Sequence, residues 1–267
     1  MTKAFMDIQA PFDFNRRFGG IGRLYGTEVL KDFRQRHIAV VGVGGVGSWA
    51  VEALARSGIG QITLIDFDQI AESNTNRQLP AIDPFYGEAK VSVLAQRILQ
   101  INPSCQVHVI EAFVDEENLA QLITQDLDGV IDAIDQVKIK TLMAVHCLKL
   151  NIPLVVSGSA GGKCDPTQLT QADLSAVTHD PLLANMRYDL RRRHGLPREG
   201  KKMRIACIYS TEAIIKPIKT TQNAGQSAPQ GLSCSGYGAS MMVTASFGLA
   251  ATAYLLNRLS LSKPATS

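Results

Sequence analysis

Four closely spaced glycines and one downstream aspartate supply the clearest chemistry in this sequence. The glycines are Gly42, Gly44, Gly45 and Gly47, in the segment GVGGVG, and the aspartate is Asp66. Glycine permits a sharp backbone turn and lets a phosphate approach the amides at a helix N-terminus, where the helix dipole favours negative charge. A carboxylate about 20 residues further on can accept hydrogen bonds from ribose hydroxyls. These residues predict a nucleotide site, although the loop alone leaves open which nucleotide it binds.

Further polar residues follow the strands expected around this loop. Asn74 and Arg77 lie in the stretch IAESNTNRQLP, Lys90 lies in the first turn of a helix, and Asp135 ends the run GVIDAID. A lysine in a first turn opposes the helix dipole, so an anionic partner explains Lys90 better than helix propensity does. Two cations and a carboxylate suit a triphosphate with magnesium, because the cations neutralise phosphate and the acid holds the metal. The residues therefore favour ATP over NAD, with turn capping and surface charge as the alternatives for Asn74 and Arg77.

An alternation of strands and helices is expected to position these groups. A strand over 38–41, a helix over 48–57 and a strand over 62–65 form one mononucleotide-binding βαβ unit. Further strands are expected over 105–110, 129–135 and 153–157, and further helices over 27–34, 87–100, 116–123 and 139–150. Asp132 falls inside its strand, Asp135 falls at the carboxyl end, and 158–162 forms a flexible lip. The pattern predicts an α/β fold, Rossmann-like and doubly wound, with a mostly parallel sheet.

Length and composition predict one compact domain. The chain has 267 residues, of which 45% are hydrophobic and 19% charged, enough for one α/β domain with an elaborated second half. We divide it into a nucleotide-binding half, residues 1–160, and a second half, residues 161–267. The five cysteines are widely spaced without a CxxC pair, and no N-terminal signal pattern is present. These features predict a reducing, cytoplasmic setting without disulfides or a cysteine-ligated zinc.

Two basic stretches raise the question of anionic partners. Arg16, Arg17 and Arg23 lie in the glycine-punctuated segment RRFGGIGRLYG, and the residues alone favour solvated surface charge for them. Residues 187–204 contain eight basic and two acidic side chains, a local charge of +6 in a chain of +3 overall. Such a cluster is usually a solvated face, but it is also a candidate phosphate-backbone surface. Its candidate contacts are Arg187, Arg191, Arg192, Arg193, Lys201 and Lys202.

Residues 220–257 contain no charged side chain. The first part is rich in Gln, Gly and Ser and predicts a loop, whereas 239–256 predicts a helix. The length of this helix approaches a membrane span, but Ser240, Thr244 and Thr252 lower its hydropathy. We therefore expect a buried or dimer-interface helix, and membrane association is disfavoured.

Several segments together resemble a known superfamily. The adenylating superfamily of ubiquitin-activating enzymes, with its bacterial relatives ThiF, MoeB and HesA, is similar in GVGGVGSWAVEALARSGIGQITLIDFD, SNTNRQ, Lys90 and DAID. Within it, the tRNA threonylcarbamoyladenosine dehydratases are similar over nearly the whole chain, in RRFGGIGRLYG, GSAGGKCDPTQ, DPLLANMR, YSTEA and SCSGYGASMMVTASFG. The resemblance implies ATP-dependent dehydration, a cyclisation, of threonylcarbamoyladenosine in tRNA through adenylation of its carboxylate.

The resemblance also implies a role for each matching residue. The four glycines would hold the ATP phosphates, Asp66 the ribose, and Asn74, Arg77 and Lys90 the triphosphate, while Asp135 would coordinate magnesium. Arg17, with Arg16 as the fallback, matches an arginine that superfamily members supply across a dimer interface, which reverses the surface interpretation. The second half would then contact tRNA, through the basic segment, and form a homodimer.

The chain also departs from its relatives. ThiF and MoeB proteins usually have two CxxC pairs that bind zinc, and this chain has none, which argues against the usual ubiquitin-like protein partner. Cys234 lies in a loop where a thiol could act, but without a paired base it is more typical of a small buried apolar residue. Two alternatives stay open: an adenylase for a ubiquitin-like or sulfur-carrier protein, and an accessory partner of a cysteine desulfurase.

Overall fold

A seven-stranded sheet forms the centre of the molecule, in the strand order β3-β2-β1-β4-β5-β7-β6. This computed structural model describes residues 12–198, 200–216 and 237–261. All neighbouring strands are parallel except β6, which pairs antiparallel with β7 at one edge. The strands are β1 (His37–Val41), β2 (Gln61–Ile65), β3 (Gln106–Ile110), β4 (Gly129–Asp132), β5 (Leu154–Ser157), β6 (Leu169–Asp173) and β7 (Ala206–Ser210). The prediction of a doubly wound, mostly parallel sheet is confirmed.

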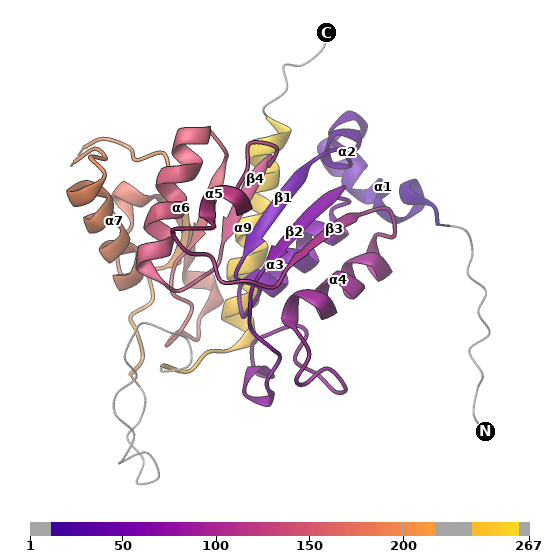
Figure 1. Ribbon diagram of the computed structural model, residues 1–267, viewed down its shortest axis with the longest axis horizontal. Helices are drawn as coiled ribbons and strands as arrows, with labels where there is room; N and C mark the ends of the chain where they lie inside the picture. The colour runs from indigo at the N-terminus through magenta and orange to yellow at the C-terminus, as the bar shows by residue number, and fades with distance from the viewer. Residues whose placement is uncertain (1–11, 199, 217–236, 262–267) are drawn as a thin grey trace.

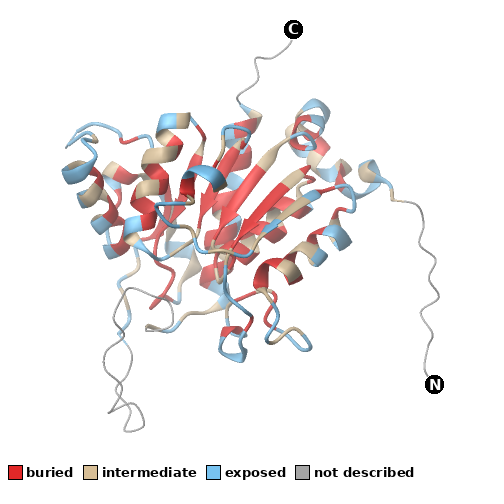
Figure 2. Ribbon diagram, viewed as in Figure 1, coloured by how far each residue is buried: buried red, intermediate tan, exposed pale blue. Residues whose placement is uncertain are grey.

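Helices cover both faces of this sheet (Figure 1). The helices are α1 (Phe14–Tyr25), α2 (Thr27–Phe33), α3 (Gly47–Arg56), α4 (Lys90–Ile101), α5 (Leu119–Leu122), α6 (Val137–Leu150), α7 (Pro181–Arg193) and α9 (Met241–Ser260). One apolar layer packs the sheet against α3, α4 and α9, and the other packs it against α5, α6 and α7. In β1, Ile38 and Val40 face the first layer whereas Ala39 and Val41 face the second, so the strand is buried on both faces (Figure 2).

The N-terminal helix α1 lies where the sequence indicated a basic, glycine-punctuated segment without a helix. The Asp13 carboxylate caps this helix by accepting a hydrogen bond from the Arg16 amide at 3.0 Å. Gly22 allows α1 to approach α2 closely, because a Cβ on it would lie 3.2 Å from Leu30 Cδ2. The helix forms because capping and close packing offset the low helix propensity of its glycines. Residues 1–11 lie outside the described residues, and Phe14 begins α1.

The charge-free helix α9 packs directly on α3. A Cβ on Gly248 would lie 2.4 Å from the Val46 carbonyl oxygen, and Thr252 Oγ1 donates a hydrogen bond to the Ala50 carbonyl at 3.2 Å. Small residues thus let the last described helix pack on the N-terminal half of the chain, as expected for the first alternative of a buried or dimer-interface helix. Within the described ranges, no helix is both long and apolar enough to cross a membrane.

Candidate nucleotide-binding site

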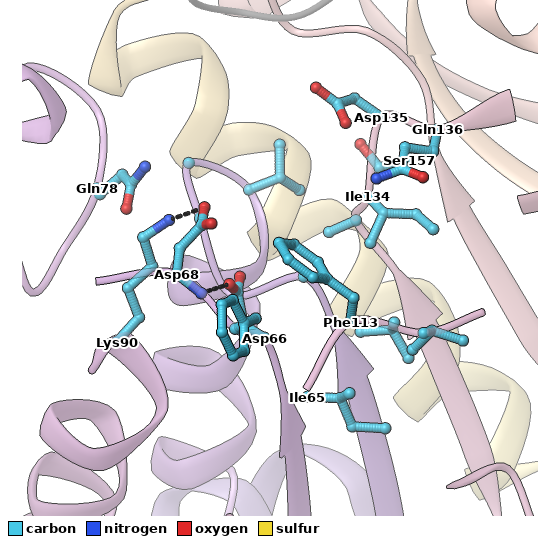
Figure 3. Close-up of a pocket in the computed structure, with 18 of the residues that line it drawn as sticks. Ile65, Asp66, Asp68, Gln78, Lys90, Phe113, Ile134, Asp135, Gln136 and Ser157 are labelled. Carbon is cyan, nitrogen blue, oxygen red and sulfur yellow. Dashed lines mark hydrogen bonds and ion pairs between the residues drawn. The ribbon is translucent and has the colours of Figure 1, made fainter. Parts of the chain in front are cut away.

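A cavity of about 440 Å³ opens where β1, β2, β4 and β5 end. Parallel strands end at one edge of a sheet, so the loops after them converge there, and doubly wound proteins bind ligands at this edge. Figure 3 shows side chains from these loops around the cavity, among them Asp66, Lys90 and Asp135. The predicted nucleotide residues that line it are Gly42, Gly44, Gly45, Asp66, Asn74, Arg77, Lys90 and Asp135.

The glycine loop after β1 makes contacts that a side chain would prevent. Gly42 has a φ of 80°, and a Cβ on it would lie 2.9 Å from Ile134 Cγ2. Gly47 is the first residue of α3 and is not part of the cavity wall; a Cβ there would lie 1.8 Å from the Gly42 carbonyl oxygen. Glycine at position 47 therefore permits the turn, whereas Gly44 and Gly45 face the ligand space.

Asp66, the residue directly after β2, is tied to this loop. Its Oδ2 accepts a hydrogen bond from the Val43 amide at 2.8 Å, and its Oδ1 accepts one from the Asp68 amide at 2.9 Å. Each carboxylate oxygen has a second lone pair, so Asp66 keeps acceptor capacity for a hydroxyl while its position is fixed. This geometry suits the predicted contact with ribose.

Lys90 already has an anionic partner within the chain. Its Nζ lies 2.7 Å from Asp68 Oδ2; the lysine side chain is 5% exposed and the aspartate side chain 56% exposed. Lys90 is also the first residue of α4, so the carboxylate compensates for the unfavourable helix dipole. Asp68, a cavity residue that the sequence reasoning missed, was detectable as the second acid in the segment IDFD.

The polar turn after β2 places three more side chains at the cavity. Asn74 Oδ1 accepts a hydrogen bond from the Ala71 amide at 3.0 Å, so it caps its turn as well as lining the cavity. Arg77 Nη1 donates to the Ser73 carbonyl at 2.7 Å and to Asn76 Oδ1 at 2.8 Å. Gln78, which the sequence reasoning did not assign, is 8% exposed, and its Oε1 accepts no hydrogen bond from the described residues. A buried acceptor without a partner at the wall of a cavity is suited to a ligand donor.

Strand β4 ends at Asp132, so the predicted extension of this strand to Asp135 is wrong. Asp132 is fully buried; its Oδ1 lies 2.8 Å from Lys140 Nζ and accepts a hydrogen bond from the Ile134 amide at 3.2 Å. That bond turns the chain out of the strand after Asp132. Burial raises the pKa of the Asp132 carboxyl against the opposing effect of Lys140.

Asp135 still reaches the cavity, from the loop after β4. It is exposed, and its carboxylate makes no hydrogen bond or ion pair with the described residues. Magnesium binds one or two carboxylates and completes its coordination with water and substrate phosphates. Among the described residues no group of three or more His, Cys, Asp or Glu could hold a metal by itself. The donor set therefore fits a magnesium ion that arrives with a nucleotide.

Arg17 lies outside this cavity in its own chain. Its Nη1 donates to the Ile101 carbonyl at 2.8 Å and to the Gln100 carbonyl at 3.1 Å, at the C-terminus of α4. Arg16 is exposed on the same helix and likewise does not line the cavity. Lys90 begins α4 at the cavity and Arg17 contacts the other end of that helix, so Arg17 does not contribute to the cavity of its own chain.

The basic segment begins near the cavity and extends away from it. Leu182, in the first turn of α7, lines the cavity, and the arginines of the last turn lie about 14 to 16 Å further along the axis. Arg187 is half-buried and donates to the Val177 carbonyl at 2.7 Å, so it holds a turn in place. Among the candidate phosphate contacts, Arg192, Arg193, Lys201 and Lys202 are exposed, whereas Arg191 is half-buried.

The segment after β5 is not a flexible lip as expected. The Asp180 carboxylate caps α7 and accepts a hydrogen bond from the Ser159 amide at 2.8 Å. A Cβ on Gly158 would lie 2.2 Å from that carboxylate, so glycine permits the contact. Ser159 and Ala160 are buried. This wall of the cavity is therefore fixed by the N-terminus of α7.

The described cysteines are unsuited to nucleophilic catalysis at this site. Burial raises the pKa of the Cys105 and Cys147 thiols to about 12, and it raises the pKa of Cys207 as well. Cys164 is exposed but does not line the cavity. Cys234 lies outside the described residues.

The mostly parallel sheet and the glycine-lined cavity at its carboxyl edge define an α/β protein of the Rossmann-like class. The family model of the ThiF family matches residues 19–261. The chain belongs to the ThiF family, which confirms the superfamily predicted from its motifs.

Individual members of the family differ in how much of this chain they match. The tRNA threonylcarbamoyladenosine dehydratase of Escherichia coli is 45% identical over 92% of this chain and 94% of its own. A crystal structure of that E. coli enzyme, TcdA, in complex with ATP matches with a TM-score of 0.83 at 44% identity, covering 92% of this chain and 94% of that chain. The molybdopterin-synthase adenylyltransferase of E. coli is 37% identical, over 51% of this chain and 52% of its own. The similarity to the dehydratase thus extends through both halves of the chain.

Proposed function

We propose that this protein catalyses the ATP-dependent dehydration of threonylcarbamoyladenosine in tRNA to its cyclic form. The observation that supports this most strongly is the 45% identity to the E. coli dehydratase over 92% of the chain. The adenylyltransferase similarity covers only 51% of the chain, so it accounts for the nucleotide half and not for the second half. The cavity contains the groups that such a reaction needs.

The cavity residues suggest how ATP would lie. The amides of the glycine loop would bind the phosphates, and Asp66 would accept hydrogen bonds from the ribose hydroxyls. Lys90 and Arg77 would neutralise the triphosphate, with Asn74 fixing the turn that presents Arg77. Because the Asp68 side chain is about half exposed at the cavity, a phosphate oxygen can join or replace it as the partner of Lys90.

The reaction then proceeds in two steps. The threonine carboxylate attacks the α-phosphate, forming an acyl adenylate and releasing pyrophosphate. The neighbouring carbamoyl group attacks the activated carbonyl, a ring closes, and AMP leaves with the former carboxylate oxygen. The net change is loss of one water from the nucleoside, balanced by cleavage of ATP to AMP and pyrophosphate.

This chemistry depends mainly on positioning and charge. Holding a carboxylate in line with the α-phosphate supplies much of the rate, and fixed dipoles and cations stabilise the charge that develops on the phosphate. The cavity offers backbone amides, Arg77 and Lys90 for that purpose. Magnesium, which Asp135 would hold, supplies charge neutralisation of the triphosphate when bound.

A homodimer would complete the site if Arg17 acts in a second copy. In its own chain Arg17 lies at the far end of α4, which is consistent with a role across an interface. Helix α9 leaves Met241, Met242 and Leu249 exposed, at 44%, 57% and 48%. An apolar face of this kind is typical of an interface between subunits.

The exposed basic residues of the 187–204 segment supply a surface for the tRNA backbone. Phosphate contacts of this kind set affinity and orientation without reading sequence. The cavity lies about 14 to 16 Å from the last turn of α7, a separation that one RNA substrate spans easily. A tRNA substrate agrees with a cytoplasmic location.

The alternatives differ in their acceptor. Adenylation of a ubiquitin-like or sulfur-carrier protein would require that protein for ATP–pyrophosphate exchange and would not respond to tRNA. An accessory partner of a cysteine desulfurase would show sulfur-dependent binding that survives Asp135→Ala. The similarity to the dehydratase covers 92% of the chain, whereas that to the adenylyltransferase covers 51%.

The test is mass spectrometry of nucleosides after incubation of threonylcarbamoyladenosine-containing tRNA with the protein, ATP and magnesium. We expect a product lighter by one water, formed only when ATP is present. Asp135→Asn, which keeps the shape of the side chain and weakens metal binding, is expected to abolish most of the product. Threonylcarbamoyladenosine that remains unchanged in the presence of the protein, ATP and magnesium would refute the proposal.

A further inference from the structure

One aromatic side chain is exposed within the basic segment 187–204. Helix α7 packs on α6 at the outside of the molecule (Figure 1) and buries Leu182 and Met186 in the core, whereas Tyr188 is 58% exposed. Among the described residues of the segment, Tyr188 is the only large hydrophobic side chain that is exposed. A tyrosine buries roughly 150 to 250 Å² when it is covered, so this one leaves much apolar area in water. The packing of α7 therefore leaves the Tyr188 ring available to a partner.

Arg192 holds this ring in place. Its guanidinium carbon lies 5.8 Å from the centre of the Tyr188 ring, and its Nη1 donates a hydrogen bond to the Tyr188 hydroxyl at 3.1 Å. The two residues are four apart in a helix, where side chains meet on one face, and the ring quadrupole attracts the cation. A side chain that is already held loses less freedom when a partner covers it. The pair thus presents an aromatic surface and a positive charge side by side.

Tyr188 lies on a row of α7 that leads from the cavity to the basic end of the helix. The exposed positions of this row, spaced by three or four residues, are Pro181, Asn185, Tyr188 and Arg192. Leu182, at the start of the row, lines the cavity, and Tyr188 follows it by six residues, about 9 Å along the helix axis. That distance corresponds to two or three nucleotides of one strand, at roughly 3.4 Å each. A nucleotide that enters the cavity therefore has near neighbours within reach of Tyr188.

The surroundings of this ring favour RNA that is not base-paired. Arg193, Lys201 and Lys202 are exposed in the same segment, and their positive charge attracts the phosphates of any nucleic acid. Aromatic faces, in contrast, stack with bases that are not already stacked in a duplex. An enzyme that modifies a base takes this base out of its stack, so a neighbouring base loses its partner on one side. An exposed tyrosine near the cavity can replace that partner.

We propose that Tyr188, held by Arg192, stacks against an unpaired base of the substrate RNA beside the nucleoside that enters the cavity. This inference rests on the proposed function for the identity of the substrate. Tyr188 is then a positioning residue, because it orients the RNA without touching the reacting atoms. The basic side chains provide affinity for RNA in general, whereas the stack selects RNA with an open loop.

Tyr188→Leu keeps an apolar side chain and removes the stacking face. Its affinity for an unmodified tRNA transcript should fall about 5- to 100-fold, the range measured for loss of a base stack. Its affinity for a fully paired RNA duplex, and the dependence of that affinity on salt, should equal those of the unaltered protein, because no phosphate contact is lost. Tyr188→Phe keeps the ring and should retain most of the tRNA affinity. Leu99→Ala, at a 44% exposed residue of α4 on the opposite face of the sheet, is the matched control and should change neither affinity.

A stem-loop RNA with threonylcarbamoyladenosine in its loop identifies the base that stacks. Each loop base in turn is replaced by an abasic residue, and binding to the unaltered protein and to Tyr188→Leu is measured. For the stacked base, the replacement should weaken binding to the unaltered protein and have no further effect on Tyr188→Leu, because both changes remove the same contact. In dehydration assays, Tyr188→Leu should raise the KM for tRNA, whereas kcat and the KM for ATP should stay nearly unchanged.

Three results would overturn the inference. Equal tRNA affinity in Tyr188→Leu and the unaltered protein would exclude the stack. Parallel loss of tRNA and duplex affinity would mean that the ring only supports the basic surface. Additive effects of Tyr188→Leu and every abasic replacement would mean that the ring contacts no base of the loop. Failure of the proposed function appears separately, as a lack of dehydration by the unaltered protein under conditions in which it still binds tRNA.

Discussion

Two lysine–carboxylate pairs in this protein have nearly the same geometry and opposite surroundings. Lys90 lies 2.7 Å from Asp68 at the cavity, and Lys140 lies 2.8 Å from Asp132 in the core. Both lysines lie in the first turn of a helix, where the dipole disfavours a cation. The difference lies in the acids, since Asp68 is 56% exposed as a side chain and Asp132 is 0% exposed.

This difference separates a pair that can exchange partners from one that cannot. Water and anions reach Asp68, so Lys90 can form an ion pair with a phosphate in place of Asp68 at little desolvation cost. No solvent reaches Asp132 or Lys140, so separation of that pair would leave a buried charge without compensation. Distance and helix position therefore do not distinguish a ligand-binding lysine from a structural one, whereas the exposure of the partner does.

The largest expected effect comes from breaking the core pair. Lys140→Met should lower the free energy of unfolding by about 3 to 5 kcal/mol, because Asp132 would remain buried without its cation. Denaturant titration measures this change. The double substitution Asp132→Asn with Lys140→Met removes the charge and keeps an acceptor for the Ile134 amide, so it should recover most of the loss. A loss below about 1 kcal/mol for Lys140→Met would mean that the two pairs do not differ as described.

The corresponding change at the cavity should alter activity and leave stability nearly unchanged. Lys90→Met removes a cation whose partner is open to water, so its cost in stability should stay within about 1 kcal/mol. Loss of one charged group that stabilises the reacting phosphate should lower kcat/KM about 100- to 1,000-fold. Dehydration kinetics and denaturant titration of the same preparation separate the two effects. Unfolding of Lys90→Met at low denaturant would contradict this assignment.

The local pattern of the sequence was sufficient to predict the βαβ unit around the glycine loop. The glycine loop, the two flanking strands and Asp66 were predicted close to their observed positions, because glycine spacing and apolar runs are local signals. Strand β7 and its antiparallel partner β6 were not predicted. Strand β7 lies more than 30 residues after β6 in the chain, and such pairing depends on contacts that no short window contains.

The site was predicted less completely, for reasons that particular residues make clear. Lys90 was identified by its conflict with the helix dipole, but the same conflict at Lys140 reports a core ion pair. Gln78 could be assigned to the site only once the loops were seen to converge on the cavity, whereas Asp68 was detectable in the sequence as the second acid of IDFD. Phe67 and Phe113, which also line the cavity, are 46 residues apart in sequence, so their contact could not be read from spacing. Helix α1 was missed because glycine has low helix propensity and the packing of Gly22 on Leu30 is tertiary.

A third ion cluster has the reverse arrangement of the cavity pair and gives the smallest expected effect. Glu52 is 10% exposed as a side chain, and its partners Arg97 and Arg56 are 40% and 61% exposed, so here the acid is buried and the cations are open. Burial raises the pKa of the Glu52 carboxyl, but hydrogen bonds from Arg97 and Arg56 outweigh burial and hold the pKa below its usual value of 4.5. An acid with a lowered pKa in the folded state stabilises the fold above its unfolded pKa, and this stabilisation is lost as the pH falls through the folded value.

Glu52→Gln should therefore lower the free energy of unfolding at neutral pH by about 1.5 to 3 kcal/mol, the contribution of hydrogen bonds to a charged group. The difference between the unaltered protein and Glu52→Gln should shrink as the pH is lowered below 4.5, because protonated Glu52 and glutamine then carry the same charge. Denaturant titrations at pH 7 and at two acidic values measure this difference. A difference in unfolding free energy that stays constant or grows toward acid would show that the exposed arginines do not stabilise the Glu52 carboxylate. Exposure of the cation would then weaken an ion pair as much as exposure of the acid weakens the Lys90–Asp68 pair.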